Sequence, residues 1–174
     1  VITMGIDLKN WMQNLPDGSD LLALNLCGTH DCVTQHIRLP HFFCCQDLTI
    51  YEQLLLGVRA LDIRVRADGK CLTMVHGIFP AYNHSCHRAN LMDMGDVLSQ
   101  CYRFLDECPG EAVVFQFKND NGKENEQCFD NLFYTYIKGK EPYWYLEDRV
   151  PTLGAARGKL VLIRRCKMEP KPDF

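Results

Sequence analysis

The segment GVRALDIRVRADGKCLTMVHG, residues 57–77, holds two apolar runs separated by a short polar segment. Residues 58–65 and residues 71–75 each have the length and the apolar content of a buried strand. The polar residues between them, 66–70, are too few for the crossover that joins parallel strands. We therefore predict an antiparallel hairpin with Gly69 in the left-handed position of its turn.

The register of this hairpin decides which side chains share a face of the sheet. A three-residue loop at residues 67–69 sets Asp62 opposite Met74. On that register His76 lies on the same face as Asp62 and Arg64. The hairpin is thus expected to bring three polar residues together.

Strand and helix patterns alternate along the rest of the chain. The predicted elements are a strand at 20–27, a helix at 48–56 that Gly57 ends, the hairpin strands, a helix within 94–110 that Pro109 and Gly110 end, a strand at 112–117, a helix within 126–139 closed by Gly139, and a strand at 159–163. This alternation favours one α/β domain with a largely parallel sheet of about five strands.

Composition excludes several classes of protein. The chain has 174 residues, 47% of them hydrophobic, and a formal net charge of −3, which suits the core of one ordinary domain. Its cations are scattered among acids, so we predict no nucleic-acid partner. No run reaches the ~18 apolar residues of a membrane span.

Ten cysteines are present, but none forms a CxxC pair or a zinc-finger spacing. We expect most of them to be free thiols that pack as small hydrophobes. Disulfides stay open for Cys86 and Cys108, and for the adjacent Cys44 and Cys45.

Titratable side chains follow each predicted strand. The strand ends read, in chain order, GTHD (28–31), DIR (62–64), HG (76–77), FKND (117–120) and RR (164–165). In parallel α/β sheets the carboxyl ends of the strands meet at one edge and carry the chemistry. Each side chain alone has an ordinary structural explanation, such as a hydrogen-bonded loop histidine or a solvated cation. Their convergence predicts a site.

Two histidines beside a fixed cation suit phosphoryl transfer. One imidazole of the pair His30 and His76 takes the proton of an attacking hydroxyl, and the other gives a proton to the leaving oxygen. Arg64 would neutralise charge on the phosphate. A divalent metal needs several oxygen ligands, and we place only Asp31 and Asp62 near these ends. Because Arg64 also repels a cation, we predict a site without a metal or other cofactor.

Five blocks of the sequence resemble the X-box region of bacterial-type phosphatidylinositol-specific phospholipase C. The blocks are NWMQNLPDGSDLLALNLCGTHD (10–31), CCQDLTIYEQLLLGVRALDIRV (44–65), VHG (75–77), FLDECPGEAVVFQFK (104–118) and TLGAARGKLVLIRR (152–165). The resemblance implies a distorted TIM-type (β/α) barrel and a metal-independent lyase. Such an enzyme cleaves phosphatidylinositol at a membrane surface into diacylglycerol and inositol 1,2-cyclic phosphate, and some act on GPI anchors as well.

The resemblance also implies a role for each catalytic residue. His30 is the general base and His76 the general acid, and Asp31 assists the acid. Arg64 holds the phosphate where calcium-dependent relatives place a metal ligand. Asp62 is an active-site carboxylate on the same strand.

Two cations are implied to bind substrate, and three residues are candidates for them. Lys118 and Arg164 match strand-end cations that hold inositol hydroxyls, and Arg165 is an equal alternative to Arg164.

The resemblance covers nearly all 174 residues but only about the amino-terminal half of the family's catalytic domain. We therefore expect residues 1–174 to be a single X-box domain, truncated at its carboxyl end, with an incomplete barrel and a tendency to self-associate. The absent strands carry the carboxylate that orients the base histidine in relatives. Two alternatives stay open: a non-catalytic module that binds inositol phosphates, and a metal-dependent enzyme of the glycerophosphodiesterase type.

The compartment stays open as well. Family precedent implies a secreted or membrane-surface protein. The many unpaired-looking cysteines equally fit a reducing compartment, so the cytoplasm is not excluded.

Overall fold

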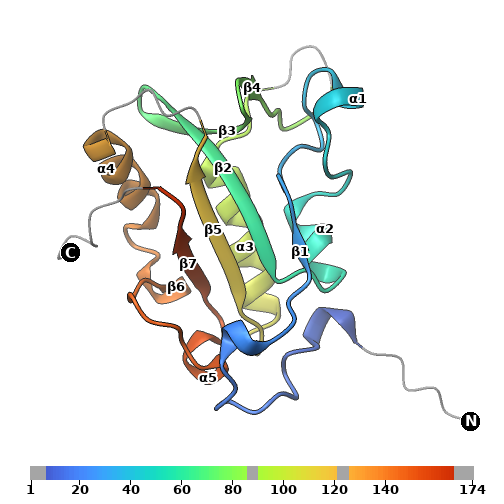
Figure 1. The fold of residues 1–174 in the computed structure, drawn as a ribbon, viewed down its shortest axis with the longest axis vertical. Coiled ribbons are helices and arrows are strands. Elements are labelled where there is room, and N and C mark those ends of the chain that lie inside the picture. The colour runs from blue at the N-terminus through green and yellow to red at the C-terminus, as the bar shows by residue number, and fades with distance from the viewer. Residues whose placement is uncertain (1–6, 86–89, 121–125, 167–174) are drawn as a thin grey trace, which may run out of the picture.

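A computed structural model describes residues 7–85, 90–120 and 126–166 and has a seven-stranded mixed sheet at its centre (Figure 1). The strands are β1 (Gly28–Thr29), β2 (Ala60–Asp68), β3 (Cys71–His76), β4 (Phe79–Pro80), β5 (Val113–Asn119), β6 (Trp144–Tyr145) and β7 (Leu160–Arg164). Their order is β4-β3-β2-β5-β7-β6, and β1 also pairs with β2. Only the β2–β3 and β3–β4 pairs are antiparallel; β1–β2, β2–β5, β5–β7 and β6–β7 are parallel.

Three helices, α2 (Ile50–Leu55), α3 (Met94–Glu107) and α4 (Glu126–Ile137), cover one face of the sheet, and α3 lies behind β2 and β5 in Figure 1. The structure also has the short helices α1 (Pro40–Phe43) and α5 (Leu153–Ala156). A capping box of Thr49 and Glu52 starts α2, and one of Asp93 and Asp96 starts α3. None of the helices in the described ranges has the length and apolar character needed to span a bilayer.

Side chains of the central strands alternate between the two faces of the sheet. On β2, Leu61 and Ile63 are fully buried in the core shared with α2, α3 and α4. Asp62 and Arg64 point the other way, and the parallel register sets Arg64 beside Lys118 of β5. One face of the sheet therefore builds the core while the other carries polar groups toward the carboxyl ends of the strands.

A second, smaller core closes the amino ends of the strands. Met12 and Leu21 of the amino-terminal segment pack there with Val114, Leu153 and Val161. Arg59 and Glu111, just before β2 and β5, form an ion pair with an Nη2–Oε2 distance of 2.7 Å. Both of their side chains are fully buried. This end of the sheet is thus built for stability.

Most of the predicted architecture is confirmed. The chain is an α/β domain, and within the described residues its sheet does not close, as expected for an incomplete barrel. The helices predicted at 48–56, 94–110 and 126–139 are α2, α3 and α4. Gly69 has the predicted positive φ, 65°. The sheet has more strands than the five predicted because short pairings at β4 and β6 join it.

The strand predicted at residues 20–27 is wrong. Its start is a single 3-10 turn, Leu21–Ala23, because the Asp20 carboxylate accepts a hydrogen bond from the Leu22 N–H at 2.9 Å and caps the turn. Parallel pairing with β2 begins only at Gly28, opposite Ala60.

The predicted hairpin register is also wrong. Asp68 pairs with Cys71, so the loop has two residues, and Met74 lies opposite Val65 instead of Asp62. The hydrophobic pattern explains the difference, because this register buries Met74 completely on the helix-covered side. After Met74 the strand leaves β2, and His76 pairs with Phe79 of β4.

Eight cysteine side chains are described, and all are free thiols: Cys27, Cys32, Cys44, Cys45, Cys71, Cys101, Cys108 and Cys166. Within the described residues, Cys44, Cys45 and Cys108 therefore form no disulfide, although one had been left open for them. Cys86 lies outside the described residues.

Candidate active site

His30 and Asp31 lie directly after β1 and face the polar side of β2. The His30 Nδ1 atom is 3.0 Å from Asp62 Oδ2, and its Nε2 atom is 3.1 Å from Asp31 Oδ2. Arg64 Nη2 is 3.2 Å from the same Nδ1. Both ring nitrogens of this exposed histidine thus lie within 3.2 Å of charged side chains, Asp62 and Arg64 at Nδ1 and Asp31 at Nε2.

The backbone of Asp31 is in the left-handed region, with φ 44°, which Asp tolerates better than most residues. This conformation turns the carboxylate inward, where its side chain is only 1% exposed. The Cys32 N–H donates to the Asp62 carbonyl at 3.3 Å, and the Thr34 hydroxyl donates to the Asp31 carbonyl at 2.9 Å. The loop is therefore held against β2.

His76 reaches the same carboxylate from β3. Its Nε2 atom is 3.7 Å from Asp31 Oδ2. Its Nδ1 lies 3.0 Å from the carbonyl oxygen of Phe43, which can only accept, so Nδ1 carries a hydrogen. This contact leaves Nε2 as the ring nitrogen that faces Asp31.

The Arg64 guanidinium lies among three carboxylates. Its Nε donates to Asp62 Oδ2 at 3.1 Å and is also 3.1 Å from Asp31 Oδ1, while Nη1 is 3.8 Å from Asp120 Oδ2. The Asp120 carboxylate also accepts the Gly77 N–H at 2.7 Å and pairs with the Lys118 ammonium. The cation is thus fixed in position next to His30 and the backbone that follows His76.

Neighbouring carboxyl groups differ in the direction of their pKa shifts. Burial raises the pKa of Asp31 and outweighs the attraction of Arg64, His76 and His30. Burial also acts on Asp62, but hydrogen bonds from Arg64, the Asp31 N–H and Gln116 hold its pKa below the usual value. Adjacent titratable groups whose pKa values are pushed apart are typical of acid–base sites.

The structure distinguishes the two arginines predicted as alternatives. Arg165 Nη1 is 3.9 Å from Asp62 Oδ1, so Arg165 lies near the site. Arg164 is opposite Phe117, whose side chain is in the helix-covered core, and it pairs with Asp148. The placement of Arg164 at the site is therefore wrong, because strand alternation turns it to the other face.

Three polar residues that sequence reasoning missed support the site. Gln116 donates to Asp62 Oδ1 at 3.1 Å, and its polar side chain within an apolar strand was the available signal. Asp120 stood in the FKND strand end but was not singled out. Gln53 is buried in α2, where its amide donates to the Cys32 carbonyl at 2.8 Å and accepts from the Thr29 hydroxyl at 2.7 Å. The sequence of α2 contains no signal for that role.

Among the described residues, one group could hold a metal ion: His30, Asp31 and Cys45, with one ligand atom from each within 4.8 Å of the others. The cysteine brings a soft ligand that hard oxygen-seeking cations do not prefer.

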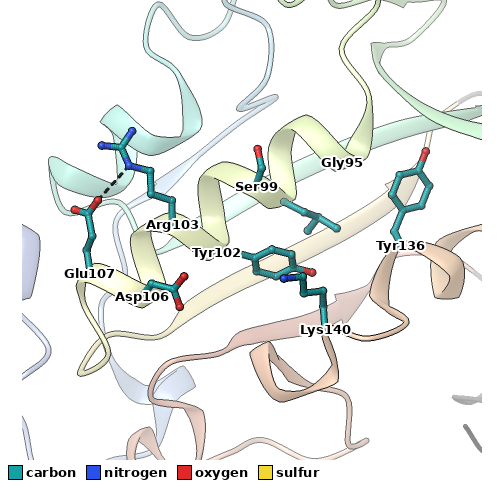
Figure 2. A pocket seen from close by; sticks show the side chains of 9 residues that line it. Gly95, Ser99, Tyr102, Arg103, Asp106, Glu107, Tyr136 and Lys140 are labelled. Carbon is teal, nitrogen blue, oxygen red and sulfur yellow. Dashed lines mark hydrogen bonds and ion pairs between the residues drawn. The ribbon is translucent and has the colours of Figure 1, made fainter.

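A groove of about 570 Å³ on the helical layer is separate from this site (Figure 2). Tyr102 and Arg103 of α3 line it together with Tyr136 and Lys140, and Arg103 is paired with Glu107 at 3.1 Å. It contains none of the predicted site residues.

Fold and site together define an α/β protein with a partial barrel and an imidazole–carboxylate–guanidinium cluster at the carboxyl ends of its strands. No family model matches the chain. The chain is nevertheless similar in sequence and structure to bacterial phosphatidylinositol-specific phospholipases C, as its motifs predicted.

Two curated relatives are 1-phosphatidylinositol phosphodiesterases. The protein of Listeria monocytogenes is 27% identical over 173 residues, covering 93% of this chain and 50% of the relative. That of Staphylococcus aureus strain Newman is 28% identical over 166 residues, covering 90% and 51%. A crystal structure of the Staphylococcus aureus phosphatidylinositol-specific phospholipase C superposes with a TM-score of 0.76 at 28% identity, covering 91% of this chain and 53% of that one. The chain thus spans about half the length of the curated relatives it matches.

Proposed function

We propose that the site cleaves the phosphodiester bond of phosphatidylinositol by general acid–base catalysis without a metal. One observation supports this most directly: His30 and His76 approach the same carboxylate oxygen of Asp31, at 3.1 and 3.7 Å, beside the guanidinium of Arg64. Two imidazoles and a fixed cation are the groups that a displacement at phosphorus needs when it is assisted by a general base and a general acid.

His30 takes the proton of the inositol 2-hydroxyl, whose oxygen then attacks phosphorus. Asp31 and Asp62 stabilise the imidazolium that forms. His76 gives its Nε2 proton to the departing glycerol oxygen as the phosphorus–oxygen bond breaks. The products are diacylglycerol and inositol 1,2-cyclic phosphate. Each positioned proton transfer contributes about 10²–10⁴ in rate.

Arg64 takes the electrostatic role in this mechanism. It faces the site with its charge balanced by carboxylates, so a phosphate that binds there competes for an existing cation and needs no bound metal. Lys118, which pairs with Asp120, and Arg165, 3.9 Å from Asp62, are the cations that we propose contact the inositol hydroxyls. The same head-group phosphodiester occurs in GPI anchors, which we include in the proposed substrate class.

The decisive experiment measures cleavage of phosphatidylinositol in detergent micelles in the presence of EDTA. We expect release of inositol 1,2-cyclic phosphate, followed by phosphorus NMR, and a loss of about 10²-fold or more in His30→Ala. His84→Ala is the matched control, because His84 is an exposed histidine outside the cluster. Turnover that EDTA abolishes, or full activity in His30→Ala, contradicts the mechanism.

A second candidate is an inositol-phosphate-binding module without turnover. The observation that favours it is the open sheet, since the polar face is not enclosed by further strands within the described residues. Calorimetry with myo-inositol 1-phosphate separates the two functions: binding that Arg64→Ala removes, with no product from phosphatidylinositol, supports the module.

A further inference from the structure

We propose that His30, Asp31 and Cys45 form a site for a thiophilic divalent cation of the Zn²⁺ class, and that occupation of this site inhibits the protein. Binding itself is independent of the proposed function. Only the inhibitory consequence rests on it, because the cation would bind the ring of His30, the residue proposed to take the proton of the substrate.

The distances among the ligand atoms suit one tetrahedral ion. One ligand atom from each of the three residues lies within 4.8 Å of the others, and His30 Nε2 is 3.1 Å from Asp31 Oδ2. Nitrogen and oxygen ligands about 2.0–2.1 Å from Zn²⁺ at the tetrahedral angle are about 3.4 Å apart. His30 and Cys45 are exposed and can rotate to close the remaining gap, while buried Asp31 stays in place. His76 Nε2, 3.7 Å from the same Asp31 oxygen, is a candidate for the fourth ligand.

Asp31 supplies an independent indication of a missing partner. Its side chain is 1% exposed, yet neither carboxylate oxygen accepts a hydrogen bond within the described residues. The cations near it, Arg64 and His30, are at ion-pair distance without hydrogen-bond geometry. A buried carboxylate in this condition is costly, and a coordinated cation removes the cost.

The sulfur of Cys45, unlike that of its neighbour, lies within 4.8 Å of ligand atoms of His30 and Asp31, and it is 3.8 Å from the Phe43 carbonyl oxygen. The Cys45 N–H donates to the Thr34 hydroxyl at 2.8 Å, which anchors Cys45 beside the Asp31 loop. The Cys44 thiol instead contacts the Gln46 carbonyl at 3.3 Å and is not part of the group. The chain therefore offers an adjacent cysteine as a matched control.

The charges balance when the ion binds. The S–H bond of Cys45 breaks, the sulfur bonds to the cation, and the proton passes to the buffer. Thiolate and carboxylate together neutralise the two charges of the ion, so Arg64 beside Asp31 is tolerated. A cation held by oxygen ligands alone lacks the thiolate and would meet the repulsion of Arg64. The site is thus selective for soft cations.

Calorimetric titration of the EDTA-treated, desalted protein with ZnCl₂ tests the binding, in two buffers of different ionisation enthalpy. We expect one ion and about one released proton per chain, with affinity reduced about 10–100-fold in Cys45→Ser and unchanged in Cys44→Ser. Cd²⁺ should give a sulfur-to-metal charge-transfer absorption that Cys45→Ser loses. Equal affinity in the two variants, or no binding by the unmodified chain, overturns the proposal.

Inhibition is read separately, as the ratio of phosphatidylinositol cleavage with and without Zn²⁺. We expect the ratio to fall in the unmodified chain and in Cys44→Ser, and to recover on addition of EDTA. If the chain shows no cleavage at all, the proposed function fails while the calorimetric result still decides the metal site. Binding without inhibition overturns the inhibitory half of the proposal.

Discussion

The carboxylates of Asp31 and Asp62 both contact His30, and their pKa values are shifted in opposite directions. Burial raises the pKa of Asp31, whereas hydrogen bonds from Arg64 and its neighbours outweigh burial and lower the pKa of Asp62. The difference arises from geometry, because Asp62 accepts hydrogen bonds and Asp31 does not. One residue is therefore stabilised in its charged form, and the other is not.

This contrast predicts opposite effects on stability. The folded-state pKa of Asp31 is raised, so its charge destabilises the fold above that pKa, and Asp31→Asn should increase the free energy of unfolding at neutral pH. The pKa of Asp62 is lowered, so its charge stabilises the fold above the unfolded value of about 3.9, and Asp62→Asn should decrease the free energy of unfolding. Both effects should fade as acid protonates the carboxylates of the unmodified chain. Urea unfolding at a series of pH values measures them, and shifts of the same sign at pH 7 would contradict the assignment.

The residues of the site were largely predictable because strand ends are visible in the sequence. His30, Asp31, Asp62, Arg64 and His76 were all named from that position, and they do converge. Their catalytic roles stay predictions. Asp120 and Cys45 lie on loops, whose paths over the strand ends depend on tertiary packing and leave no periodic signal.

At the scale of elements, α2 connects the helical layer to the His30 loop. Gln53 lies on the buried side of this helix, and its amide donates to the carbonyls of Cys32 and Leu48, both at 2.8 Å. The Thr29 hydroxyl donates to the same side chain. The helix therefore positions the loop as well as packing against the sheet.

Gln53→Leu should impair catalysis beyond its effect on stability. Its loss leaves the buried Cys32 carbonyl and the part-buried Leu48 carbonyl without this donor, at a cost of about 1–3 kcal/mol. A loop displaced by about 1 Å can lower kcat about 10²-fold. Thr49→Ala is the control, since it removes the cap of α2 for about 1 kcal/mol without touching the loop. Urea unfolding and kcat in the micelle assay are compared, and equal kcat in the two variants would refute a positioning role.

For the β2–β3 hairpin, the sequence predicted the strands and their pairing but not their register. Two strands, their antiparallel pairing and the left-handed Gly69 followed from chain length and glycine chemistry. The register did not, because loops of two and three residues are both compatible with the sequence. Burial of Met74 against the helical layer decided between them.

In the whole molecule, the two ends of the sheet differ. The amino ends of the strands carry the buried ion pair of Arg59 and Glu111 and are called the stability end, whereas the carboxyl ends carry the histidines. At the stability end, the Arg59 guanidinium donates to Glu111 at 2.7 Å and to the Leu54 and Lys9 carbonyls, and the Met12 N–H donates to Glu111 at 3.0 Å. This pair joins the starts of β2 and β5 to the amino-terminal segment. It lies at the end opposite the histidines, so it can be altered separately from the chemistry.

Arg59→Met should destabilise the chain by about 3–5 kcal/mol, because it leaves the Glu111 charge buried without its partner. Arg149→Met, which breaks the exposed pair with Glu147, should cost much less, because solvent screens that pair. Chemical denaturation at neutral pH measures both changes. Similar losses of stability in the two variants would show that burial does not determine the cost of breaking the Arg59–Glu111 pair.

The open sheet leaves self-association as a prediction. Its outermost parallel strands, β1 and β6, are each only two residues long, which limits pairing between edges. The polar face between them is therefore the surface to consider, rather than a strand edge.

The sequence alone determined the α/β class, the order of the main helices and strands, and the set of polar residues at the strand ends. These are local properties, since periodicity, glycine positions and strand ends can be read within a few residues of each other. Only the tertiary structure decided the hairpin register, the choice of Arg165 over Arg164, and the presence of Asp120 and Cys45 beside the histidines. Each of these depends on which face a side chain takes and on contacts between distant segments, and packing of the whole core selects them.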